Sequence, residues 1–74
     1  MISRVIKIST YKLENFRLIC DVYDSQNIKT AILDLMKFSS PEKVLNIIDL
    51  SLDKSLEVEG NIKDNILYIE KICS

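Results

Sequence analysis

Few side chains in this sequence could do chemistry, and their types exclude most catalytic and metal-binding mechanisms. The chain has no histidine, one glycine and two cysteines, Cys20 and Cys73. Zinc sites take three or four Cys or His ligands, and a Ser or Cys nucleophile normally needs a histidine base beside it. Phosphate-binding loops need several glycines. We therefore expect no enzyme, no metal and no cofactor.

Two pairs of carboxylates remain, Asp21 with Asp24 and Glu57 with Glu59. Paired carboxylates serve acid–base chemistry or hard cations, but a cation site also needs further oxygen ligands on a bent loop. Neither pair has such a loop, so we interpret both as solvated surface groups.

Length and charge indicate one small domain, and the functions that remain are binding functions. The chain has 74 residues, of which 47% are hydrophobic, so we expect a single domain, residues 1–74, with one core. Ten basic and eleven acidic side chains give a net charge of −1, which excludes nucleic-acid binding by bulk charge. Two cysteines are too few for a disulfide scaffold, and no secretion signal is evident. These features favour an intracellular protein, cytoplasmic or nuclear, with free thiols.

Alternating apolar residues predict four strands, and one helix start is clear. The strands are 2–11, 16–23, 56–63 and 66–73, and polar segments at 12–15, 24–27 and 63–65 are expected turns. Ser40 and Pro41 suit the N-cap and first turn of a helix over residues 41 to about 54.

The stretch Ile28 to Phe38 fits two structures. Ile28, Ala31, Ile32 and Leu35 have the spacing of an amphipathic helix. The local pattern favours the helix, but the stretch also suits a strand with apolar side chains on both faces, and periodicity alone does not decide between the two. A helix here gives two strands, two helices and two strands, an α+β sheet covered by a helix pair.

With 28–37 extended, the order of elements resembles the oligonucleotide/oligosaccharide-binding (OB) fold, a mainly β, five-stranded Greek-key barrel with one helix between strands three and four. FRLICDVYDSQNIKTAILDLM, residues 16–36, resembles the hairpin of its second and third strands. SLEVEGNIKDNILYIEKI, residues 55–72, is similar to the closing hairpin, in which one glycine lets the fourth strand bend. The chain is most similar to small scaffolding subunits of replication protein A-like, telomere-capping or RecQ-accessory complexes.

That resemblance implies a non-catalytic subunit that docks on a larger protein partner in a nucleic-acid-associated complex. Apolar residues outside the expected core suggest the partner-binding set: Ile19, Phe38, Ile47, Leu50, Ile66 and Tyr68. Single-stranded nucleic acid is a further partner, for which the family's binding face implies Tyr11, Lys12, Arg17, Tyr23, Lys29 and Lys63. We expect no membrane contact and no small-molecule substrate. The α+β alternative would suit an inhibitor or adaptor that occludes a partner's surface.

Overall fold

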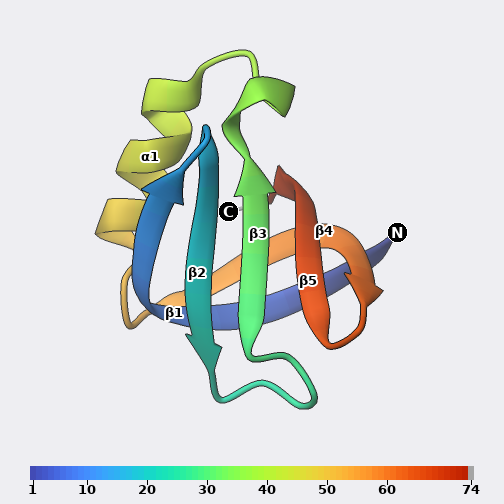
Figure 1. The fold of residues 1–74 in the computed structure, drawn as a ribbon. Helices are drawn as coiled ribbons and strands as arrows, with labels where there is room; N and C mark the ends of the chain where they lie inside the picture. Colours follow the sequence, from blue (N-terminus) through green and yellow to red (C-terminus); the bar gives the residue numbers. More distant parts are fainter. Residues whose placement is uncertain (74) are drawn as a thin grey trace.

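Alternating side chains give five strands one buried face each, and these faces share a single core (Figure 1). The computed structural model describes residues 1–73. In chain order its elements are β1 (Ile2–Glu14), β2 (Arg17–Tyr23), β3 (Thr30–Asp34), the 3₁₀ turn η1 (Leu35–Lys37), α1 (Pro41–Leu50), β4 (Ser55–Lys63) and β5 (Ile66–Ile72).

The strands form a closed barrel in the order β1-β2-β3-β5-β4, with β4 pairing back onto β1. β3 and β5 run parallel, and the other neighbouring pairs are antiparallel. With α1 between β3 and β4, this is the OB-like barrel expected from the resemblance, and the arrangement with two helices is wrong. Residues 30–34 are extended because strands on both sides satisfy their backbone groups, which outweighs the helical spacing of their side chains.

β1 bends without a glycine because it is shared between two partners. Its residues 2–7 pair with β4, and its residues 7–14 pair with β2. A bulge between Ile8 and Thr10 lies near the change of partner, and bulges sharpen the bend of a strand.

The turn between β1 and β2 lies later than the sequence predicted. Its two residues are Asn15 and Phe16, with φ angles of 52° and 61°, and Glu14 pairs directly with Arg17. Two consecutive left-handed residues make a tight hairpin whose twist matches the flanking strands. Phe16 therefore lies in the turn, although its alternation with Leu18 had predicted that it belongs to a strand face.

α1 begins at Pro41 as predicted but ends at Leu50 instead of about residue 54. Ser40 is at the N-cap position, although its side chain makes no capping hydrogen bond. Beyond the helix, Leu52 bridges Ile8, and the Asp53 N–H donates to the Ile8 carbonyl at 2.8 Å. Pairing with β1 thus stops the helix one turn early.

The core fills the barrel and extends under α1. Ile6, Leu18, Leu33, Val58 and Leu67 are among its fully buried strand residues. Ile48 of α1 is equally buried and belongs to the same core, so the helix packs against the barrel through this residue. No helix within residues 1–73 combines the length and the apolar character that crossing a membrane requires.

Gly60 lies at a close approach of the β4 and β5 backbones. A Cβ atom at this position would overlap the carbonyl oxygen of Tyr68, and a register shift between Glu59 and Gly60 marks a bulge here. Only glycine fits, because the obstructing atom belongs to the backbone of the neighbouring strand.

We predict that Gly60→Ala lowers the free energy of unfolding by about 2 kcal/mol or more, because β4 and β5 must separate to admit the methyl group. Asn61→Ala is the control, because the Asn61 side chain is exposed and its loss should change stability by about 0.5 kcal/mol or less. Urea denaturation followed by circular dichroism measures both. Equal stability of Gly60→Ala and the wild type would contradict the close approach.

Candidate binding face

Three outward side chains form an apolar row across neighbouring strands. Ile19 of β2 pairs with Ile32 of β3, which pairs with Tyr68 of β5. Side chains of paired residues lie on the same face of a sheet, so the three are neighbours outside the barrel. Tyr68 is 38% exposed, and both isoleucines are half-buried. We call the outward side chains of β2, β3 and β5 around this row the outer face.

Charged side chains of both signs border the row. In the next register row, Arg17 of β2 lies opposite Glu14 of β1 on one side and opposite Asp34 of β3 on the other. Lys37 of η1 makes an ion pair with Glu70 of β5 at 3.3 Å. Arg17 takes part in none of the ion pairs formed within residues 1–73. Its guanidinium is therefore available to an incoming anionic group.

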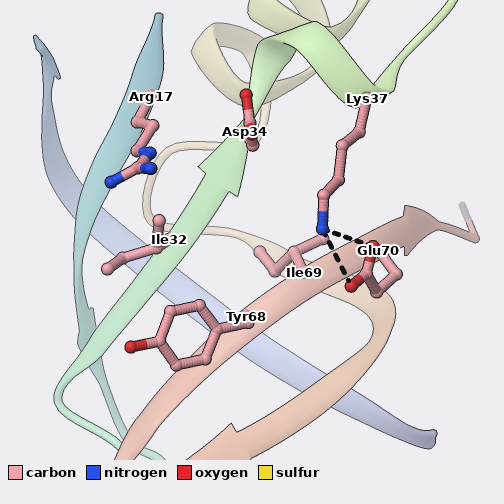
Figure 2. A pocket seen from close by; sticks show the side chains of 7 residues that line it. All are labelled: Arg17, Ile32, Asp34, Lys37, Tyr68, Ile69 and Glu70. Carbon is pink, nitrogen blue, oxygen red and sulfur yellow. Dashed lines mark hydrogen bonds and ion pairs between the residues drawn. The ribbon is translucent and has the colours of Figure 1, made fainter. Parts of the chain in front are cut away.

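A pocket of about 240 Å³ lies in this part of the outer face. Figure 2 shows Ile32 between Arg17 and Tyr68, with the Lys37–Glu70 pair on the other side of the pocket. Sites for whole small ligands usually measure about 300–1,000 Å³. This pocket is smaller, and its size suits one side chain or one base of a larger partner.

The structure brings only some of the predicted nucleic-acid-binding residues to the outer face. Lys12 pairs with Ile19 from the β1 side, and Arg17 borders the pocket. Lys29 precedes β3 and Lys63 ends β4, so both lie at the end of the sheet opposite Arg17.

Tyr11 and Tyr23 instead connect the barrel to α1 and the segment after it. The Tyr11 ring packs against the core, and its hydroxyl donates to the Asp49 carboxylate of α1. The Tyr23 hydroxyl donates to Asp53 Oδ1 at 3.0 Å. Hydrogen bonding to Asp49, together with burial, raises the pKa of Tyr11. Burial and then the bond to Asp53 raise the pKa of Tyr23.

The predicted partner-binding residues fall into separate groups. Ile19, Ile66 and Tyr68 lie on outward positions of β2 and β5, with Ile66 one register row from Tyr68 on the same side of β5. Phe38 and Ile47 pack against the core. Leu50 is 74% exposed but belongs to α1, which Figure 1 places beside β1 and away from β5.

Sequence reasoning missed Ile32, Lys37 and Glu70 as parts of this face. Ile32 has an outward position only if residues 28–37 form a strand. Its neighbours on the adjacent strands cannot be identified until the register between the strands is known. Lys37 and Glu70 come together from segments 33 residues apart. No local pattern indicates such a pair.

Neither thiol is in a setting that would make it reactive. Burial raises the pKa of Cys20 to about 12, with a smaller effect from Asp21. Burial also raises the pKa of Cys73, and its thiol donates to Glu59 Oε2 at 3.3 Å. Within residues 1–73, no three His, Cys, Asp or Glu side chains gather closely enough to hold a metal ion.

Comparison with protein-family models, with curated proteins and with solved structures yields no significant match to this chain. The functional argument therefore depends on the geometry of the outer face.

We predict that iodoacetamide at pH 8 alkylates Cys73 slowly and leaves Cys20 unmodified in the folded protein. The thiolate is the reactive form, and a raised pKa leaves a smaller fraction of each cysteine as thiolate at pH 8. Mass spectrometry of the peptides, with the protein in 8 M urea as the control, measures the rates. Equal labelling of Cys20 in the folded and unfolded protein would contradict its burial.

We predict that Tyr11→Phe lowers the free energy of unfolding by about 0.5–1 kcal/mol, because one hydrogen bond between β1 and α1 is lost. Tyr23→Phe is the matched variant and should lose less, because Tyr23 is the more exposed of the two. Urea denaturation gives the values. If Tyr11→Phe instead kept full stability and weakened binding to an oligonucleotide, the sequence-based role of Tyr11 would be supported.

Proposed function

We propose that this protein is a non-catalytic subunit that docks on a larger protein partner through the outer face of its barrel. The observation that carries the proposal is the apolar row Ile19, Ile32 and Tyr68, bordered by charges of both signs. Protein interfaces combine an apolar centre containing aromatic residues with a polar rim, and arginine is enriched in them.

The charges near the row favour a protein over a polyanion. Lys37 is already paired with Glu70, and Lys12 with Glu14 at 3.6 Å. Asp34 also lines the pocket. A protein partner can present both signs to these groups, whereas a row of phosphates would be repelled by the carboxylates.

Single-stranded nucleic acid is the second candidate, and Arg17 is the observation that favours it. Among the described residues, 1–73, its guanidinium has no ion-pair partner, and it lines the same pocket as Tyr68, on which a base could stack. Such stacking contributes roughly 1–3 kcal/mol per base. The resemblance to the OB fold supports a place in a nucleic-acid-associated complex under either candidate. Both cysteines are free, which suits the reducing interior of a cell.

Photo-crosslinking from the outer face tests the proposal. Ile32 is replaced by the photoreactive residue benzoylphenylalanine, and the tagged chain is irradiated in its native cell. Lys43, exposed on α1, carries the same replacement in the control variant. We expect a discrete protein adduct from position 32 and none from position 43. An adduct that nuclease digestion removes would favour the second candidate, and no adduct from position 32 would overturn both.

For the second candidate, the measurement is fluorescence anisotropy of a labelled oligo-dT. We predict no binding at physiological salt, because the chain has a net charge of −1 and carboxylates border Arg17. Should the oligonucleotide bind, Arg17→Gln must reduce the slope of log affinity against log salt by about 1, while Lys43→Gln must leave it unchanged. Tight, salt-dependent binding with that slope change would make nucleic acid the primary partner.

A further inference from the structure

The turn between β1 and β2 holds an exposed aromatic ring in an unfavourable backbone conformation. Phe16 has a φ of 61° and is 67% exposed. The second position of such a turn favours glycine, because a Cβ atom is strained in the left-handed region. Burial of the ring does not offset that strain. Residues held in strained backbone conformations cluster at active sites, ligand-binding sites and switch regions.

Two more exposed apolar side chains lie at the same end of the barrel. Leu13 ends the inward face of β1 and is 56% exposed, and Met36 of η1 is 74% exposed. Figure 1 shows the β1–β2 turn and η1 together at this end. We call Leu13, Phe16 and Met36 the turn patch.

Hydrogen bonds fix the backbones that carry the turn patch. The Phe16 carbonyl accepts from the Leu35 N–H at 2.9 Å, which ties the turn to η1. The Asp34 carboxylate accepts from the Met36 N–H at 3.0 Å and so caps η1. Fixing these backbones in advance lowers the entropy that binding would otherwise lose.

We propose that the turn patch is a second docking site, at which Phe16 enters an apolar pocket of a folded protein partner. The charged row of Glu14, Arg17 and Asp34 lies between the turn of this patch and the apolar row of Ile19, Ile32 and Tyr68. The chain therefore has two distinct apolar surfaces and can bridge two proteins, or two parts of one. This inference does not depend on what binds the outer face.

The area of the turn patch argues against a second copy as its occupant. Three side chains expose at most roughly 500 Å², because even an aromatic residue buries only about 150–250 Å². Two such patches facing each other would bury about 1,000 Å² in total, less than the roughly 1,200–2,000 Å² of stable interfaces. A concave apolar pocket is the better fit, because one aromatic side chain that is fully desolvated in a pocket can supply most of the binding energy of a small interface.

The chemistry of the turn patch argues against nucleic acid. Phe16 is its only ring on which a base could stack, because Leu13 and Met36 are aliphatic. Glu14 and Arg17 flank the turn with opposite charges, so these two side chains give phosphate no net attraction.

The test begins with the chain carrying benzoylphenylalanine at position 36, irradiated in its native cell. We expect a discrete protein adduct that nuclease treatment does not remove. The crosslinked protein is then produced recombinantly and titrated with three forms of the chain: wild type, Phe16→Gly and Val5→Ala. Val5 is the control, because it is apolar and 60% exposed but lies in the half of β1 that pairs with β4.

The expected result is a stability gain together with a binding loss. Phe16→Gly should raise the midpoint of urea denaturation, because glycine relieves the strain at this φ. The same variant should bind the partner at least tenfold more weakly, while Val5→Ala binds as the wild type does. Binding of Phe16→Gly within twofold of wild type would overturn the proposal. An adduct with a second copy, a nuclease-sensitive adduct or no adduct at position 36 would also overturn it.

Crosslinking from position 32 in the same preparation keeps the two proposals apart. An adduct at 32 but not at 36 supports docking through the outer face alone. An adduct at 36 but not at 32 supports the turn patch and removes the proposed function of the outer face.

Discussion

The architecture depends on the parallel pairing of β3 with β5. Thr30 to Leu33 pair with Ile66 to Ile69, and this contact closes the barrel. The same contact places Ile32 between Ile19 and Tyr68, so the apolar row exists only because the barrel closes here. Stability and the candidate binding face therefore share one structural cause. A change that opened this seam would remove both together.

Much of the fold could be predicted from the sequence, and the parts that could not are those decided by distant residues. Two-residue alternation located β2, β4 and β5, and Pro41 located the start of α1. The local pattern of residues 28–38 favoured a helix, and pairing with the neighbours β2 and β5 is what makes residues 30–34 a strand. Leu52 has the spacing of a helical residue, but its bridge to Ile8 ends the helix first. Phe16 contradicts the local preference of its turn, so no rule of turn composition could locate it.

The binding face was predictable in the same partial way. Alternation along β2 and β5 put Ile19, Ile66 and Tyr68 on outward positions before any register was known. Tyr11 shows the limit of residue type as a signal. A tyrosine suits both base stacking and a buried ring with a hydrogen-bonded hydroxyl, and here the Asp49 carboxylate is its partner. Such a contact spans 38 residues of sequence and leaves no local trace.

The division of β1 between two partners has a consequence for how the chain folds during synthesis. β1 can pair with β2 as soon as residue 23 has left the ribosome, but its first half must wait for residues 55–60 of β4. Until then residues 2–7 form an unprotected strand edge, which other nascent chains can also pair with. The protein should accordingly fold slowly for its size, with a vulnerable interval in which a chaperone that shields extended segments has most effect.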